Sequence, residues 1–255
     1  MFQQILTCIA QYDTIILHRH HKPDGDAMGS SVAMYHYLNV FASADAKIVL
    51  NDPCPPYLQF LTEGIPASDL IIRQDRPVEA ETAVRDSDLL FCLDFNAFHR
   101  TDKLENALKE SKADKILIDH HLNPDRECFD LSFSETDISS ASELTYQILM
   151  ETGRIAHDAS MLPAASATAL MTGMTTDTNN FANSTYPSTF RMASALLAAG
   201  VDRDAILANL YNQYGENRLR VLGHMMKDLM TITGDGVAYI ILDKETLERY
   251  NVAEG

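Results

Sequence analysis

The sequence predicts an α/β fold in which a mainly parallel β-sheet carries helices on both faces. In the first half of the chain, short apolar runs rich in β-branched residues alternate with amphipathic stretches of helical period. Strands that alternate with helices pair in parallel, because each helical crossover returns the chain to the same end of the sheet. With 255 residues, 46% of them hydrophobic, the chain can bury one full-sized core and add a small second lobe.

Five apolar runs are predicted to be strands of this sheet. The first, TIIL at 14–17, ends in a polar loop, and an amphipathic helix over 27–38 follows, with Asp26 as its predicted N-cap. Between the last two strands we expect a helix near 103–112. The four later strands are predicted at 47–50 (KIVL), 70–72 (LII), 89–93 (LLFCL) and 115–118 (KILI).

The second half of the chain is predicted to be mainly helical. A more polar helical stretch over 202–230 follows three apolar-rich helices, the last of which ends at Gly200. A Gly-Asp-Gly turn at 234–236 then precedes a strand over 237–242 and a final short helix. The three apolar-rich helices are expected over 140–150, 162–172 and 188–199.

This pattern divides the chain into three predicted parts. The first domain is expected over 1–190, followed by a helical connector over 191–230. The segment 231–255 holds one predicted strand and one helix, which cannot close a core of their own. We therefore expect it to be the beginning of a second α/β domain that is cut short.

Composition excludes several classes of function. The net charge of −16 disfavours long duplex nucleic acid, which is normally bound through clustered lysine and arginine. No apolar run is long enough to span a bilayer and no basic leader is visible, so a cytoplasmic protein without a membrane partner is expected. The four cysteines include no C-x-x-C pair, which argues against a disulfide framework or a zinc ribbon.

Four short strings place carboxylates and imidazoles directly after apolar stretches. The carboxyl ends of parallel strands meet at one edge of a sheet, where open α/β folds bind their ligands. We therefore expect these side chains to converge. The strings are HHKPDGDAMGS at 20–30, FCLDFNAFHR at 91–100, LIDHHLNPD at 117–125 and MTGMTTDTNNF at 171–181.

The residue types in these strings predict a site for two divalent metals. Asp24 and Asp26 are two residues apart in a loop and can each face a different ion, with Asp94 as the candidate bridge and Asp177 closing the set. A bridged pair about 3.5–4 Å apart is the arrangement used in two-metal phosphoryl chemistry. Taken alone, the Asp-x-Asp pair has another interpretation, as loop acids of which Asp26 only caps a helix.

Together these motifs resemble the DHH phosphoesterase family. LIDHHLNPD is similar to its signature, and the other three strings are similar to its remaining motifs in the correct order. The resemblance covers about residues 1–200 and is greatest to the branch of short-oligoribonucleotide hydrolases that also dephosphorylate adenosine 3′,5′-bisphosphate (pAp). It implies that the first domain is catalytic and that 231–255 begins a substrate-binding domain, although the Gly-Gly-His-type motif of that domain is missing.

The resemblance also implies a role for each residue of the site. His20 and Asp24 would bind the first metal, and Asp94 would bridge to the second. Asp119 would orient the ligands, His121 would face the scissile phosphate, and Arg100 would contact phosphate oxygens, although a surface arginine is an equal interpretation. The ligands implied for the second metal are Asp26, His120 and Asp177.

The implied activity is hydrolysis of short RNA oligonucleotides or of a small phosphorylated nucleotide such as pAp. Two Mn²⁺ ions are the expected cofactors, because the donors are carboxylates and imidazoles without a thiolate, and Mg²⁺ can substitute. A pyrophosphatase or exopolyphosphatase, a phosphodiesterase of cyclic dinucleotides or pApA, and a metal-bound nucleotide sensor are the alternatives. The sequence leaves a homodimer open.

Overall fold

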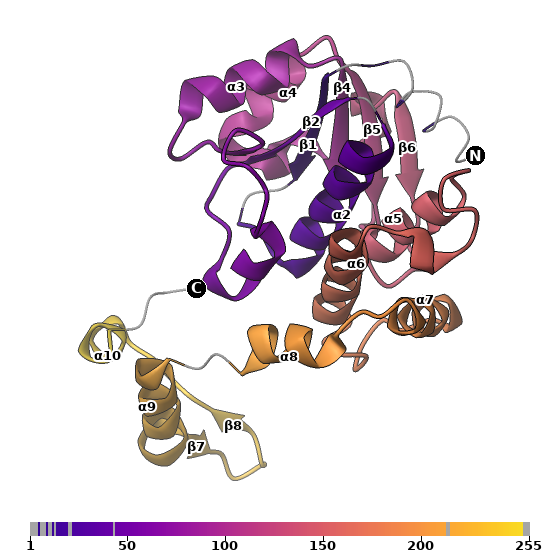
Figure 1. Cartoon of the computed structure of the whole chain (residues 1–255). Helices are drawn as coiled ribbons and strands as arrows, with labels where there is room; N and C mark the ends of the chain where they lie inside the picture. The colour runs from indigo at the N-terminus through magenta and orange to yellow at the C-terminus, as the bar shows by residue number, and fades with distance from the viewer. Residues whose placement is uncertain are drawn as a thin grey trace. The chain divides into compact units, whose positions relative to one another are not determined.

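Six strands form one sheet in the order β3-β2-β1-β4-β5-β6 (Figure 1). The computed structural model describes residues 14–19, 22–42, 44–212 and 215–251 together with residues 5, 9 and 12, and of residues 18 and 19 only the backbone. All five strand pairings are parallel, which confirms the predicted fold class. The strands are β1 (Thr14–Arg19), β2 (Asp45–Leu50), β3 (Leu70–Ile72), β4 (Leu89–Leu93), β5 (Asp114–Asp119) and β6 (Leu131–Ser134).

Helices α3 (Pro77–Asp86) and α4 (Glu105–Glu110) cover one face of the sheet (Figure 1). Successive side chains of a strand point to opposite faces, so only alternate strand residues reach these two helices. Together they form a continuous apolar core on this side of the sheet. Its buried members include Ile16, Val49, Ile71, Ala80, Val84, Leu90, Cys92, Leu108 and Leu117.

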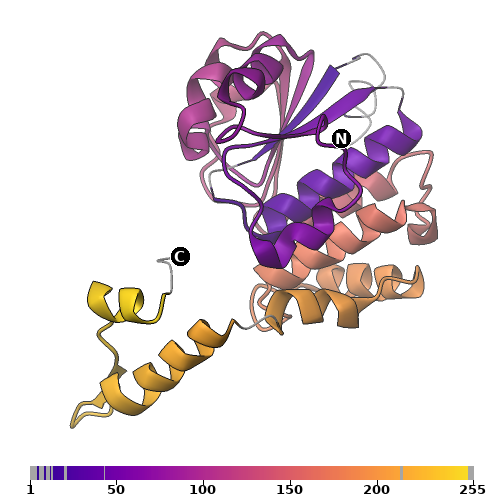
Figure 2. The same cartoon turned by 60° about the vertical axis from the view of Figure 1, so that its left-hand side comes forward.

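Helices α2 (Gly25–Phe41) and α5 (Ala141–Met150) cover the opposite face and α6 (Ala164–Asp177) packs against both of them, so the predicted two-sided covering is confirmed. In Figure 2 the sheet lies between the two helical layers, with α2 in violet and α6 in salmon on one side. Helix α7 (Pro187–Ala198) packs against α5 and α6.

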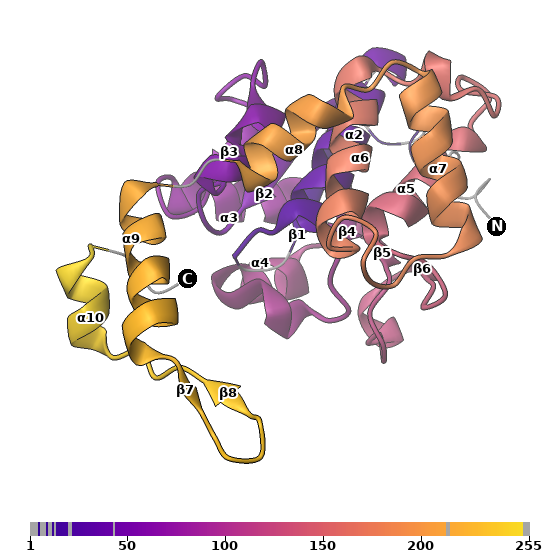
Figure 3. The ribbon, with the colours of Figure 1, turned by 90° about the horizontal axis from the view of Figure 1, so that it is seen from below.

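Helices α2 and α6 lie side by side and approach each other closely (Figure 3). The contact is made by glycines: a Cβ atom at Gly29 would lie 2.6 Å from the carbonyl oxygen of Ala169 and 2.9 Å from Cα of Gly173. Both neighbours are backbone atoms of α6, which cannot move aside as a flexible side chain does. The missing side chains therefore set the distance between the two helices.

Three features of the first unit differ from the sequence prediction. Helix α2 begins at Gly25, and its N-cap is Asp24, whose carboxylate accepts a hydrogen bond from the Ala27 backbone N–H (3.0 Å); the prediction of Asp26 as the cap is wrong. Strand β6 and helix α3 were not predicted. β6 has only four residues, one of them buried, so its apolar signal is weak.

Residues Leu207–Gly255 form a second compact unit, and Met1–Ile206 form the first. The stretch expected to be one helix over 202–230 is interrupted, because α8 (Arg203–Tyr211) ends before Gly215, the N-cap of the next helix. The predicted turn is confirmed, but the strand expected over 237–242 is paired at only two residues. The domain boundaries at 190 and 230 stay a prediction. The elements are α9 (Glu216–His224), the π-helical turn η5 (Met225–Leu229), β7 (Thr231–Ile232), β8 (Ala238–Tyr239) and α10 (Lys244–Arg249).

None of the helices in the described part of the chain combines the length and apolar composition that a bilayer span requires. The longest of them, α2, has 17 residues and is packed within the first unit.

The close contact of α2 with α6 predicts the effect of Gly29→Ala. Alanine favours a helix over glycine by about 1 kcal/mol, but here its methyl group meets backbone, and such overpacking costs about 1–3 kcal/mol. We expect a lower midpoint of urea unfolding measured by circular dichroism. The matched control is Gly223→Ala in α9, where a new Cβ meets nothing within 4 Å. A Gly29→Ala midpoint equal to or above that of the parent protein would contradict the packing argument.

Candidate metal centre

The candidate site lies where the strand order of the sheet reverses. β1 and β4 are neighbours, while the chain runs outward from them to β2 and β3 on one side and to β5 and β6 on the other. Crossovers leave such a switch point in opposite directions, and a crevice opens beyond the carboxyl ends of the strands. Asp24, Asp94 and His120 follow the ends of β1, β4 and β5. The expected convergence at this edge of the sheet is therefore observed.

Asp94 occupies the centre of the site. It follows β4 directly, is 2% exposed, and has a φ angle of +61°, a left-handed conformation that is uncommon for residues other than glycine. Its backbone N–H donates to the carbonyl oxygen of Ile118 on β5 (3.0 Å), which anchors this turn to the sheet. Strained backbone of this kind costs roughly 1–3 kcal/mol and is concentrated at functional sites. Here it turns a carboxylate toward the two histidines that follow β5.

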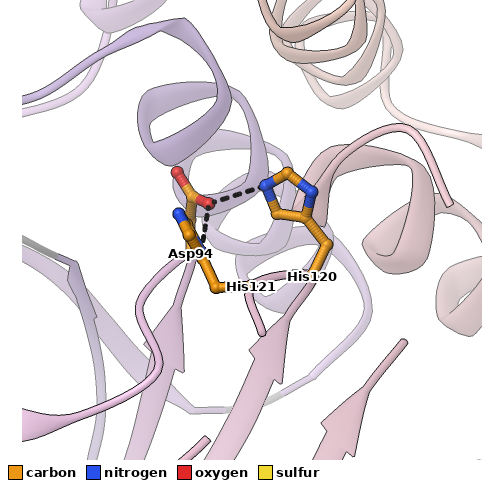
Figure 4. A group of neighbouring side chains, drawn as sticks. All are labelled: Asp94, His120 and His121. Atoms are coloured by element: carbon orange, nitrogen blue, oxygen red, sulfur yellow. Dashed lines mark ion pairs between the residues drawn. The ribbon is translucent and has the colours of Figure 1, made fainter. Parts of the chain in front are cut away.

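His120 is the side chain on which the carboxylates converge. Its Nε2 atom lies 3.4 Å from Oδ1 of Asp94, 3.8 Å from Oδ2 of Asp26 and 3.6 Å from Oδ2 of Asp177. Figure 4 shows Asp94 facing both histidines. The three carboxylates come from the end of β4, the first turn of α2 and the last residue of α6. Three separate segments thus meet at one imidazole nitrogen.

His121 has a different partner from its neighbour. Its Nδ1 atom lies 2.7 Å from Oδ1 of Asp119, and its backbone N–H donates to Oδ2 of the same carboxylate (3.1 Å). A carboxylate accepts hydrogen bonds, so Nδ1 carries the ring proton and Nε2 is left as the acceptor. Nδ1 also lies 3.7 Å from Oδ1 of Asp94. Asp119 is fully buried and fixes both the ring orientation and the tautomer of His121.

Asp26 is held by the N-terminus of α5. It is 1% exposed, and its two carboxylate oxygens accept the backbone N–H groups of Ala141 (2.7 Å) and Ser142 (2.8 Å). These groups belong to the first turn of a helix, where amides without a helical partner and the helix dipole favour negative charge. Sequence reasoning missed this anchor. The Ser-x-x-Glu pattern at Ser140 marks the start of α5 and was the available signal.

The remaining predicted residues have different surroundings. Asp24 is exposed at the cap of α2, and its charge contributes to raising the pKa of Asp177. Arg100 is exposed in the 3₁₀ helix η2 (Phe98–Leu104) that follows β4. His20 lies outside the described residues. Asp177 lies beyond the helix predicted over 162–172, but in the structure this helix extends further and Asp177 is the last residue of α6.

Burial and neighbouring charges shift the pKa values of three residues of the site, Asp26, Asp177 and His120. Burial raises the pKa of Asp26 well above its usual value, and the charges of Asp94 and Asp177 raise it further. Burial likewise raises the pKa of Asp177 to about 6, with His120 opposing the shift. Burial alone lowers the pKa of His120, but its hydrogen bond to Asp94 and the surrounding carboxylates outweigh this and raise it to about 9.

The donor set is suited to hard divalent cations. Two groups of three residues, Asp94 with His120 and His121, and Asp26 with His120 and Asp177, each bring their ligand atoms within 4.8 Å of one another. Carboxylates forced together in a buried site repel each other, and a divalent cation relieves that repulsion while taking the oxygen and imidazole ligands it prefers. His121, which was not expected to be a ligand, belongs to one of these groups.

Comparison with known proteins identifies the family. The model of the DHH family, N-terminal domain, matches residues 14–174. The chain belongs to the DHH family. This confirms the resemblance seen in the four sequence motifs, and it makes the protein a phosphoesterase of the hydrolase class.

Relatives of this DHH protein have similar sequences over nearly its full length. One is the probable bifunctional oligoribonuclease and PAP phosphatase NrnA of Streptococcus mutans, 30% identical over 99% of this chain and 74% of the relative. Another is the bifunctional oligoribonuclease and PAP phosphatase NrnA of Bacillus subtilis, 27% identical over 98% of this chain and 73% of the relative.

A solved structure confirms the fold of this DHH protein. The crystal structure of an exopolyphosphatase-related protein from Bacteroides fragilis superimposes with a TM-score of 0.90 at 30% identity. The match covers 100% of this chain and 72% of the other.

Protonation of His120 predicts how metal affinity depends on pH. In the metal-free protein its proton is a stabilising contribution, complete below the ordinary histidine pKa and lost as the pH rises through about 9. A metal at Nε2 must displace this proton, so Mn²⁺ affinity should rise about tenfold per pH unit between about pH 7 and 9. Titration calorimetry in buffers of different ionisation enthalpy should detect one proton released. His120→Gln should flatten the slope, whereas pH-independent affinity of the parent would refute the assignment.

Proposed function

We propose that this protein hydrolyses phosphoester bonds of short oligoribonucleotides and of pAp with the help of two Mn²⁺ ions. The observation that carries the proposal is the convergence of Asp26, Asp94 and Asp177 on Nε2 of His120 at the switch point of the sheet. The choice of substrate is supported by the two NrnA relatives, whose names state both activities. Mg²⁺ is the proposed substitute, and the cytoplasmic location and the homodimer stay predictions.

The residues of the site divide into metal ligands and groups that face the substrate. We assign His20 and Asp24 to one metal, with Asp94 shared between both; Asp26, His120 and Asp177 complete the second. When bound, the two ions would lower the pKa of a water molecule to give the nucleophile and would neutralise charge on the phosphate. Manganese fits better than zinc because the described donors include no thiolate.

Asp119 and His121 form the proposed pair next to the scissile phosphate. Asp119 holds Nδ1–H of His121, so Nε2 is the acceptor that can take the proton of the attacking water, and only as Nε2–H can it donate to a phosphate oxygen. Arg100 is exposed on η2, directly after the turn that carries Asp94, where a guanidinium can approach phosphate oxygens in a bidentate manner. We assign Arg100 to substrate binding and His121 to the reacting phosphate.

A second candidate function keeps the same site but takes polyphosphate or pyrophosphate as its substrate. It is favoured by the Bacteroides fragilis structure, whose name relates it to exopolyphosphatases. A third is hydrolysis of cyclic dinucleotides or pApA, since the cyclic-di-AMP phosphodiesterase GdpP of Geobacillus thermodenitrificans is 30% identical over 76% of this chain and 29% of the relative.

Substrate assays separate these candidates. The Mn²⁺-loaded protein would be incubated with an RNA dinucleotide, pAp, pApA, pyrophosphate and a short polyphosphate, and the products measured by chromatography. We expect hydrolysis of the dinucleotide and of pAp, with chelation by EDTA abolishing both. Exclusive turnover of pyrophosphate or polyphosphate would replace the proposed substrate, and binding of nucleotide without turnover would favour the sensor interpretation.

Asp94→Asn tests the proposed bridge. Asparagine has a similar size and tolerates a positive φ angle, so the turn is retained while the negative charge is lost. Removal of one preorganised electrostatic group typically lowers turnover about 10²-fold or more, and we expect kcat on pAp to fall by at least that factor. Asp86→Asn at the end of α3 is the control for loss of one acidic charge elsewhere. Near-normal Mn²⁺-dependent turnover by Asp94→Asn would show that another residue bridges the metals.

A further inference from the structure

A second polar cavity lies at the same edge of the sheet as the candidate metal centre. It has a volume of about 230 Å³ and is formed where β2 and β3 end, next to η2 and the first turn of α3. Its walls carry groups of both charges, in contrast to the acidic centre. The polar lining residues are Asn51, Asp52, Arg73, Gln74, Asp102 and Lys103.

The cavity is level with Asp94 and one strand away from it. Val49 of β2 and Cys92 of β4 are both in register with His18 of β1, the strand between them. Asn51 and Asp94 each follow two residues later, so they lie at the same level on either side of β1. Neighbouring strands are about 4.8 Å apart, which places the two backbones roughly 10 Å from each other. Asp52 also accepts a hydrogen bond from the Lys22 backbone N–H (3.1 Å), in the loop that leads to Asp24.

Asn51 presents a buried acceptor that lacks a partner among the described residues. Its side chain is 6% exposed, and its Nδ2 group donates to the carbonyl oxygen of Thr101. That carbonyl can only accept, so the orientation of the amide is determined and Oδ1 is the orphaned atom. Its backbone oxygen is already engaged by the N–H of Gln74 (3.1 Å). An unsatisfied buried acceptor costs free energy, and a donor from a molecule bound in the cavity would relieve that cost.

Two residues of the cavity lining, Arg73 and Lys103, carry positive charge. Nε and Nη2 of Arg73 both bind Glu81 (3.1 and 2.6 Å), which fixes the guanidinium, while Lys103 is exposed at the mouth. Pro77, the first residue of the ten-residue helix α3, also lines the cavity, and the N-cap Arg76 makes no side-chain capping bond. The first turn of a helix attracts anions through its open N–H groups and its dipole. A phosphate group could therefore interact with Arg73, Lys103 and the first turn of α3.

We propose that this cavity binds the ribose and phosphate of one nucleotide unit of the substrate, next to the unit that is hydrolysed. A ribose 2′-hydroxyl donates to Oδ1 of Asn51, the carboxylate of Asp102 accepts from a neighbouring hydroxyl, and Arg73 with Lys103 meets the phosphate. The 2′-hydroxyl is the group by which proteins distinguish RNA from DNA. This subsite deepens, and rests on, the proposed function, and it makes Asn51 a specificity-determining residue.

Direct binding tests the cavity without catalysis. The full chain in EDTA would be titrated with ribose 5-phosphate and with 2-deoxyribose 5-phosphate and followed by NMR. We expect the ribose compound to bind about threefold to tenfold more tightly, the range for one neutral hydrogen bond. Asn51→Leu should remove the preference between the two sugars. Lys103→Gln should weaken both, whereas Lys112→Gln, an exposed lysine outside the cavity, should change neither.

Equal binding of the two sugars by the parent protein, or unchanged binding by Lys103→Gln, would overturn the subsite. Since Lys103 is exposed, that variant keeps the test decisive even if Asn51→Leu does not fold. Turnover separates this failure from failure of the proposed function. If the Mn²⁺-loaded parent hydrolyses an RNA dinucleotide but Lys103→Gln leaves its KM unchanged, only the subsite is wrong. If the parent hydrolyses neither the dinucleotide nor pAp, the proposed function itself fails.

Discussion

The carboxylate of Asp26 joins the elements on which the site depends. Asp26 lies in the first turn of α2, its carboxylate accepts the first two N–H groups of α5, and its Oδ1 atom would lie 3.0 Å from a Cβ atom placed on Gly173 of α6. Such close helix packing is compatible with a charged group only because two amides and a helix dipole satisfy it. The same interaction that joins three helices on one side of the sheet therefore delivers a carboxyl group to the cluster at its edge.

The neighbouring carboxylates define the second constraint on the molecule. Asp26, Asp94 and Asp177 surround one imidazole, and the charges of Asp94 and Asp177 raise the energetic cost of ionising Asp26. A protonated His120 balances part of this charge in the metal-free protein, and bound cations would balance more of it. The strained turn at Asp94 and the buried carboxylate of Asp119 show that the fold tolerates unfavourable local energies to hold this geometry.

The carboxyl edge of the sheet has two regions that differ in charge. Around β1, β4 and β5 it is acidic, as a site for divalent cations requires, whereas beyond β2 and β3 it combines Arg73 and Lys103 with an orphaned amide oxygen. A nucleotide substrate carries a phosphate to be hydrolysed and hydroxyls and further phosphates to be recognised. One sheet edge can serve both needs because each strand delivers its own loop to it.

The sequence by itself determined the parallel α/β class, the DHH family and the gathering of Asp26, Asp94, His120 and Asp177 at the sheet edge, because strand and helix periodicity and short motifs are local properties of the chain. Only the tertiary structure decided that Asp24 rather than Asp26 caps α2, that Asp119 orients His121, and that α5 holds Asp26. The tertiary structure also decided the hydrogen bond between Asn51 and Thr101, which are 50 residues apart in the sequence. The contacts of Asp26 with α5 and of Asn51 with Thr101 join distant segments, so they depend on how the elements pack. The Asp24 cap and the Asp119–His121 pair are local, but their geometry is not specified by periodicity.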